Sequence, residues 1–162
     1  MEKVIAICGK ICCGKTYYSN ALKTKENAVV LSCDEVTSFL FDNNLGDKHD
    51  EMTKKIKKYL LKKSLDIIKT KTSVVLDWGF WSKKDRAEIK EYFKKNNVIC
   101  ELHYIDIDNS SWKQNIEERN IRVLSGMGNG DYYLDKGLME KLMCFWEEPS
   151  KEEIDVWHKL KR

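Results

Sequence analysis

Proline and glycine, the residues that make interdomain linkers, are scarce in this chain. Its 162 residues contain one proline and eight glycines, and no Pro-rich or Gly/Ser-rich stretch separates one part from another. A sequence without such a linker, at a length that suits one compact core, is typical of a single domain. We therefore expect one domain over residues 1–162.

Long hydrophobic runs are also missing. A membrane-spanning helix needs roughly 20 apolar residues in succession, and no run approaches that length. The apolar stretch 4–8 near the N-terminus is too short for the core of a signal peptide, and it leads directly into a glycine-containing loop that cleavage would destroy. The sequence therefore predicts a cytoplasmic protein without a membrane partner.

An excess of either charge is absent too. Lysine and arginine number 29 against 26 aspartates and glutamates, which gives a net charge of +3. That balance is too weak to indicate a nucleic-acid partner by itself, although it does not rule one out. The positive charges gather in one segment, whose simplest interpretation is a solvated helix face. They are Lys54, Lys55, Lys57, Lys58, Lys62 and Lys63.

The cysteines lack the spacing of a metal site or a disulfide framework. Cys12 and Cys13 are adjacent, whereas structural zinc sites use spaced ligand pairs. Cys33, Cys100 and Cys144 stand alone in the sequence. Reduced thiols that pack as small hydrophobic groups are therefore the expected state.

What the sequence does contain is an alternation of strand-like and helix-like segments. Short apolar runs predict strands at 4–8, 28–31, 73–77, 98–105 and 153–157. Helical patterns follow at 16–23, 34–41, 50–69, 83–95, 110–123 and 134–145, with Ser110 or Ser111 as the cap of the fifth. This alternation predicts an α/β fold, with a parallel sheet covered by helices on both faces. Ligands bind such sheets beyond the carboxyl ends of the strands, where Gly9, Asp34 and Asp77 lie.

One eight-residue segment matches the phosphate-loop pattern G-x-x-x-x-G-K-[ST] at every fixed position. It comprises Gly9, Lys10, Ile11, Cys12, Cys13, Gly14, Lys15 and Thr16. In such a loop, glycines let backbone N–H groups turn toward phosphate oxygens, and the following helix adds its positive N-terminal end. Lys15 is expected to contact the β- and γ-phosphates of ATP, and the Thr16 hydroxyl to bind Mg²⁺. Nucleotide binding is therefore the main functional prediction.

Two carboxylates follow predicted strands and are candidates for the chemistry at the phosphates. Asp77 closes the third strand, the place of a Walker B carboxylate that orients Mg²⁺ directly or through water. Asp34 closes the second strand just before a helix, from where it is expected to accept the proton of an attacking hydroxyl. Aspartate is also a favoured helix N-cap, so a purely structural role stays open for both.

Two arginines are candidates for positive charge opposite the loop. Arg119 and Arg122 stand three residues apart and share a helix face. They precede the glycine-rich stretch 126–130, where a lid over about residues 119–133 is expected to hinge. Guanidinium groups match phosphate oxygens in charge and geometry, so both arginines are candidate catalytic residues. An ordinary charged helix surface is the alternative.

Four further residues are candidate contacts of the phosphate acceptor. Trp78, Phe80 and Trp81 follow Asp77 closely, and they form either an aromatic wall for a ring or base or a part of the core. Arg86 faces either the acceptor or a partner in a surface ion pair. The sequence leaves these alternatives open.

Together, four segments resemble a known family: 9–16, 31–35, 74–80 and Arg119-Asn120-x-Arg122. They are similar to the small kinases labelled AAA-type ATP-binding proteins, a group similar to chloramphenicol phosphotransferase, zeta toxin and the polynucleotide 5′-hydroxyl kinases. The resemblance extends over nearly the whole chain. It implies a five-stranded parallel P-loop kinase fold with a small helical lid, Asp34 as general base, and ATP with Mg²⁺ rather than GTP.

The expected activity is transfer of the γ-phosphate of ATP to a hydroxyl of a small molecule, a nucleoside or a nucleic-acid 5′ end. An NTP-hydrolysing switch is the alternative from another class, and it needs a water-positioning residue. The only glutamine, Gln114, falls in a predicted helix and is not an obvious candidate. Similarity to zeta toxin implies a third alternative, phosphorylation of a nucleotide sugar. No acceptor motif distinguishes between the candidates.

Overall fold

The computed structural model describes residues 1–42, 44–128 and 131–160. The strands in these ranges are β1 (Val4–Cys8), β2 (Ala28–Ser32), β3 (Ser73–Gly79), β4 (Cys100–Ile107) and β5 (Val156–Leu160). The helices are α1 (Lys15–Lys25), α2 (Cys33–Phe41), the 3-10 turn η1 (Gly46–Lys48), α3 (His49–Lys69), α4 (Lys83–Lys95), α5 (Asn109–Leu124) and α6 (Lys136–Met143). None of the helices in these ranges has the length and apolar character needed to cross a membrane.

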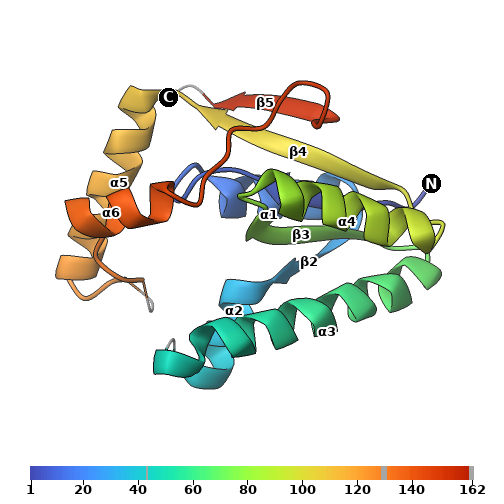
Figure 1. The fold of residues 1–162 in the computed structure, drawn as a ribbon, viewed down its shortest axis with the longest axis horizontal. Helices are drawn as coiled ribbons and strands as arrows, with labels where there is room; N and C mark the ends of the chain where they lie inside the picture. Colours follow the sequence, from blue (N-terminus) through green and yellow to red (C-terminus); the bar gives the residue numbers. More distant parts are fainter. Residues whose placement is uncertain (43, 129–130, 161–162) are drawn as a thin grey trace.

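All five strands pair in parallel in one sheet, in the order β2-β3-β1-β4-β5 (Figure 1). Parallel neighbours need a crossover connection, and helices in the chain supply it. β1 lies at the centre, between β3 and β4, and all of its residues are fully buried. The predicted α/β fold with a five-stranded parallel sheet is confirmed.

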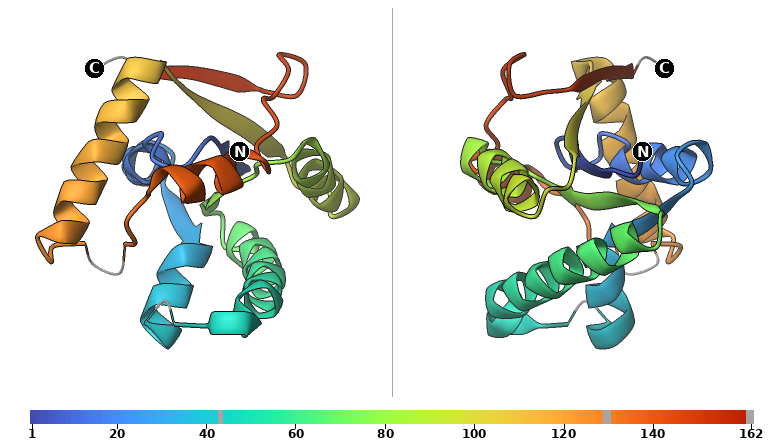
Figure 2. Two further views of the ribbon diagram at one scale, coloured as in Figure 1. Left: turned by 60° about the vertical axis from the view of Figure 1, so that its left-hand side comes forward. Right: turned by 90° about the vertical axis from the view of Figure 1, so that its right-hand side faces the viewer.

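The sheet separates two hydrophobic cores. Successive side chains of a strand point to opposite faces. Val4 of β1 packs into the core that α3 and α4 cover, where Phe93 of α4 is fully buried. Ile5 and Ile7 pack into the opposite core, which Leu22 of α1 helps to close. The right-hand view of Figure 2 shows α4 and α1 on opposite sides of the sheet, so both faces are covered as predicted.

Side-chain caps set the starts of two helices. Ser82 and Asp85 form a reciprocal capping box at the start of α4. α5 starts slightly before its predicted position, because Asp108 is its cap rather than Ser110 or Ser111. The Asp108 carboxylate accepts hydrogen bonds from the N–H of Ser111 at 2.9 Å and from its hydroxyl at 2.7 Å. A negative charge at a helix N-terminus is favourable, which explains the earlier start.

The last helix is shorter than predicted. α6 covers Lys136–Met143 instead of 134–145. Asp135 caps it by accepting the N–H of Leu138 at 2.8 Å. The cap stands outside the helix, so α6 begins at Lys136, two residues after the predicted start.

The last strand begins three residues later than predicted, because polar residues before it are used in other ways. β5 covers Val156–Leu160 instead of 153–157. The backbone N–H of Asp155 donates to the carbonyl of Leu102 at 2.9 Å, and its carboxylate accepts the Leu102 N–H at 2.7 Å. This pair of hydrogen bonds joins the chain to β4 just ahead of the β5 ladder.

Candidate active site

The phosphate loop joins β1 to α1 at the carboxyl edge of the sheet. Gly14 precedes α1 with a left-handed backbone (φ 94°), which glycine adopts without strain, and no side chain caps this helix. Within the described ranges, the backbone N–H groups of residues 10–14 have no backbone acceptor. These donors and the uncapped helix N-terminus have the arrangement that suits an anion, so the loop is the candidate anion site.

Two cysteines shape the loop without adding charge to it. Cys12 has a positive φ of 58°, and Cys13 is fully buried. A Cβ atom at Gly9 would lie 2.5 Å from the Cys13 Sγ, so only glycine fits there. Burial raises the pKa of both thiols above the ordinary value, and both stay neutral beside the anion site.

Lys15 lies against the loop that precedes it. Its Nζ donates hydrogen bonds to the carbonyl oxygens of Gly9 at 3.1 Å and Lys10 at 2.6 Å. The ammonium group is therefore held at the same loop that presents the N–H donors. A fixed positive charge in this place suits the outer phosphates of a nucleoside triphosphate.

Thr16 and Asp77 meet between α1 and β3. The Thr16 hydroxyl donates to the Asp77 Oδ2 at 3.1 Å. Asp77 is only 5% exposed, and burial raises the pKa of its carboxyl while Lys15 opposes the shift. The N-cap interpretation of Asp77 is wrong, because it lies inside β3 and Ser82 caps the next helix. Two adjacent oxygen donors are the ligand type that Mg²⁺ prefers, so this pair fits the predicted metal site.

Asp34 stands in the first turn of α2, which directly follows the strand that pairs with the Asp77 segment of β3. Its N-cap interpretation is also wrong, since Ser32 caps α2 by accepting the Glu35 N–H at 3.3 Å. Ser32 is the register partner of Asp77 across β2 and β3. Burial is the main cause of the raised Asp77 pKa, and the negative charge of Asp34 raises it further. Asp34 is exposed, and no hydrogen bond or ion pair within the described residues engages its carboxylate. It is therefore available to a second substrate.

α5 supports the phosphate loop through a row of side chains. The indole N–H of Trp112 donates to the Ile11 carbonyl at 2.7 Å, and the Asn115 amide donates to the Cys12 carbonyl at 2.8 Å. Arg119 continues the row, with Nη1 3.8 Å from the Cys12 Sγ. Sequence reasoning identified Arg119 but missed Trp112 and Asn115. Their spacing of three and four residues, which places all three on one helix face, is the signal that would have found them.

Arg119 and Arg122 have different surroundings despite their spacing. The Arg119 side chain is only 16% exposed and reaches the loop, whereas Arg122 is exposed at the surface. The structure thus brings Arg119 to the candidate site, and a catalytic role of Arg122 stays a prediction. The predicted hinge at 126–130 includes Asn129 and Gly130, which lie outside the described residues, so lid motion also stays a prediction.

The aromatic residues after Asp77 do not form one wall. Phe80 is 4% exposed and belongs to the core, so the core alternative holds for it. Trp78 is half-buried, with its ring 5.4 Å from that of Phe80, and it also packs against the α2–α3 cluster. Trp81 covers Gly79, where an added Cβ would lie 2.6 Å from the indole Nε1. Acceptor contacts of Trp78 and Trp81 stay predictions.

Of the two alternatives for Arg86, the ion pair is present, but it is buried rather than at the surface. Its side chain is 1% exposed, and its Nε donates to the Glu153 Oε2 at 2.7 Å. Its Nη1 donates to the carbonyl oxygens of Phe80, Trp81 and Glu147. Arg86 therefore ties the turn after β3 to the C-terminal segment, and it faces neither an acceptor nor solvent.

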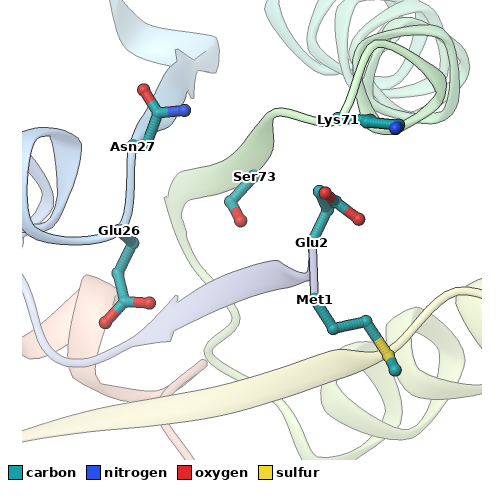
Figure 3. A pocket seen from close by; sticks show the side chains of 6 residues that line it. All are labelled: Met1, Glu2, Glu26, Asn27, Lys71 and Ser73. Carbon is teal, nitrogen blue, oxygen red and sulfur yellow. The ribbon is translucent and has the colours of Figure 1, made fainter.

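A hollow of about 170 Å³ lies at the opposite edge of the sheet (Figure 3). It is lined by Met1, Glu2, Glu26, Asn27, Lys71 and Ser73. These residues precede or begin the strands β1, β2 and β3. Nucleotides bind parallel sheets at the carboxyl edge, so the hollow is not part of the candidate site.

The clustered lysines lie along α3. Two of them pair with acidic residues of the same helix. Lys54, Lys58 and Lys62 stand four residues apart and are exposed, and no ion pair engages them within the part of the chain that is described. Residues at this spacing share one helix face. If the acceptor is a nucleic acid, this row is the candidate surface for its phosphates.

The geometry defines the class of protein. A central strand leads into the phosphate loop, and a buried aspartate on the neighbouring strand meets the threonine of the loop, as in P-loop kinases. The chain belongs to the AAA domain family, whose model matches residues 4–125. No curated protein matches it by sequence.

Solved structures share this fold at low identity. A predicted kinase from Chloroflexus aurantiacus is 16% identical with a TM-score of 0.72, over 98% of this chain and 87% of that chain. APS kinase CysC of Mycobacterium tuberculosis, solved with AMPPNP and APS, is 13% identical with a TM-score of 0.68, over 99% and 90%. Chaetomium thermophilum Kti12, solved with ADP-AlF3, is 15% identical with a TM-score of 0.68, over 97% and 88%. The shared feature is a P-loop kinase-like fold.

Proposed function

We propose that the protein is an ATP-dependent kinase that transfers the γ-phosphoryl group to a hydroxyl of an acceptor. The observation that carries the proposal is Asp34, whose exposed and unengaged carboxylate lies two residues beyond Ser32, the register partner of Asp77 on the neighbouring strand. A phosphate loop serves any NTPase. A carboxylate that is open to a second substrate at the same edge is the additional group that transfer to a hydroxyl requires.

In the proposed reaction, the acceptor oxygen attacks the γ-phosphorus in line with the bond to the β–γ bridging oxygen. As the new P–O bond forms, the hydroxyl proton passes to the Asp34 carboxylate. The bond to the bridging oxygen breaks, and its electron pair leaves with ADP. Lys15 and the N–H groups of residues 10–14 stabilise the negative charge on the phosphate oxygens.

Thr16 and Asp77 are the residues that would hold Mg²⁺, Asp77 directly or through a water molecule. Both offer oxygen donors, and the Thr16 hydroxyl already lies 3.1 Å from the Asp77 carboxylate. Bound Mg²⁺ supplies neutralisation of charge on the β- and γ-phosphate oxygens.

Asp34→Asn tests the proposed general base. Transfer of label from γ-labelled ATP is expected to fall by about 100- to 10,000-fold, the usual contribution of a general base, while ATP affinity stays near that of wild type. Glu35→Gln is the matched control, because Glu35 is an exposed acid in the same helix turn. Full transfer by Asp34→Asn, or an equal loss in Glu35→Gln, contradicts the assignment.

Pooled acceptors separate the remaining alternatives in the same assay. The pools are aminoglycosides, phenicols, nucleosides, nucleotide sugars and oligonucleotides with a 5′-hydroxyl. Transfer to oligonucleotides that weakens with salt, and with Lys58→Ala on α3, indicates a nucleic-acid acceptor. Label released only as phosphate, at one rate with and without every pool and unaltered by Asp34→Asn, favours the NTP-hydrolysing switch.

A further inference from the structure

The guanidinium group of Arg119 is enclosed on several sides. Its Nη1 lies 3.8 Å from the Cys12 Sγ of the phosphate loop. Its Nη2 forms an ion pair with the Asp131 Oδ1 at 3.2 Å. Its Cζ lies 5.1 Å from the centre of the Tyr132 ring. The carboxylate of Asp131 and the ring face of Tyr132, which are adjacent in sequence, thus hold the guanidinium group of Arg119 on α5.

The segment that carries Asp131 and Tyr132 is fixed to α5 itself. The Asn120 amide donates to the Leu134 carbonyl at 2.9 Å, and the Leu134 N–H donates to the Asn120 Oδ1 at 2.8 Å. Leu134 is 3% exposed, so its side chain anchors the same point. Asn120 is the neighbour of Arg119 in sequence, and the anchor therefore brings Asp131 and Tyr132 back to the arginine.

The hydrogen-bonding capacity of Arg119 is only partly used. Its Nε is buried and has no partner among the described residues. Its Nη1 meets only a thiol, and sulfur is a weak acceptor. One strong acceptor, Asp131, fixes the orientation and leaves donors of the guanidinium group for another anion. A buried donor without a partner is costly, so a phosphate oxygen at the adjacent loop would be a favourable partner.

Tyr132 also links the two sides of the candidate site. Its ring lies against Arg119, and the charge of Asp34 contributes to its electrostatic surroundings. Tyr132 as a whole residue is 51% exposed.

We propose that Asp131 and Tyr132 are positioning residues that form a guanidinium cradle, which holds Arg119 beside the phosphate loop for the phosphoryl group being transferred. The inference rests on the proposed function, since it assigns a task within that same site. Neither residue needs to touch the substrate, because both act through Arg119.

Chemical rescue tests the cradle. Arg119→Ala is expected to weaken binding of ADP with aluminium fluoride, a mimic of the transferring phosphoryl group, by about 10- to 100-fold, the value of one charge-assisted hydrogen bond. Binding of ADP alone should change little. Free guanidinium, added well below denaturing concentrations, should restore much of the lost affinity by occupying the cradle.

Double variants test whether Asp131 and Tyr132 are responsible for the rescue by guanidinium. Guanidinium should fail to restore binding in Arg119→Ala/Asp131→Asn and in Arg119→Ala/Tyr132→Leu. Guanidinium should still restore binding in Arg119→Ala/Tyr132→Phe, which keeps the ring face. It should also restore binding in Arg119→Ala/Glu140→Gln, which removes an exposed acid of α6. Thermal unfolding curves identify any variant that has lost its fold, and such a variant is replaced by Asp131→Ala or Tyr132→Ile.

Three results would overturn the cradle: unchanged affinity in Arg119→Ala, absence of rescue in that variant, or equal rescue in all double variants. The measurement uses only nucleotide and guanidinium. If no acceptor is ever phosphorylated but rescue still depends on Asp131 and Tyr132, the kinase proposal fails and the cradle stands. If transfer occurs and rescue is independent of both residues, the kinase proposal stands and the cradle fails.

Discussion

Lys15→Ala is expected to lower ATP turnover by about 100- to 1,000-fold, the usual loss when a fixed donor to transition-state charge is removed. The Lys15 ammonium group is positioned by two carbonyl oxygens of the phosphate loop. Alanine removes both the charge and the donor. Consumption of γ-labelled ATP measures the loss, and titration with ATP shows how much of it is binding.

Lys23→Ala is the matched control for this experiment. Lys23 is an exposed lysine in the last turn of the same helix, away from the phosphate loop. Its replacement removes an equal charge and should leave turnover near that of wild type. Turnover by Lys15→Ala that matches Lys23→Ala would remove Lys15 from the candidate site.

Arg86→Met is expected to destabilise the fold by about 3–5 kcal/mol, the cost of removing one partner from a buried ion pair. Methionine keeps the apolar length of the side chain. It leaves Glu153 without its cation, and three carbonyl oxygens lose a donor. Urea unfolding should show a lower midpoint with an unchanged slope. Lys84→Met, on an exposed i,i+4 pair of the same helix, should change stability by less than about 1 kcal/mol.

The same ion pair makes stability depend on pH. The hydrogen bond from Arg86 holds the pKa of Glu153 below its ordinary value of 4.5. In the unfolded chain, Glu153 has its ordinary pKa. At pH values between the folded and unfolded pKa, the unfolded chain therefore binds more protons, so the pair stabilises the fold fully only above the ordinary pKa. That contribution is lost as pH falls through the lowered, folded value. Wild type and Glu153→Gln should therefore differ at neutral pH and converge in acid. A constant difference at all pH values would show that another group is responsible.

The parts of the site that could be predicted are those that local sequence specifies. The phosphate loop is contiguous. Asp34 follows β2 and Asp77 lies near the end of β3, and the carboxyl ends of these apolar strands meet at one edge of a parallel sheet. The burial of Arg86 and the identity of its ion-pair partner could not be predicted, because Glu153 is 67 residues away and Glu147 is 61. No local pattern distinguishes a buried arginine with remote partners from an exposed one.

The surroundings of Arg119 illustrate the same limit. Its place on a helix ahead of a glycine-rich stretch could be predicted from the sequence. The partners Asp131 and Tyr132 could not, because the return of the chain depends on the reciprocal bonds between Asn120 and Leu134. The three-residue shift of β5 has a related cause, since Asp155 bonds to β4 before the strand begins. In each case, a tertiary hydrogen bond overrides the local pattern.

The two sides of the candidate site differ in how freely they can change. α5 carries the side chains that hold the loop carbonyls and also carries Arg119, so we expect a substitution that tilts this helix to disturb the proposed nucleotide binding and phosphoryl transfer together. The main packing partners of α2 and α3 are each other and the strands β2 and β3. Residues on α2 and α3 can therefore diversify with little effect on the nucleotide side. A protein engineer who wants a new acceptor should build libraries in these two helices, keep Asp34 of α2 unchanged, and leave α5 untouched.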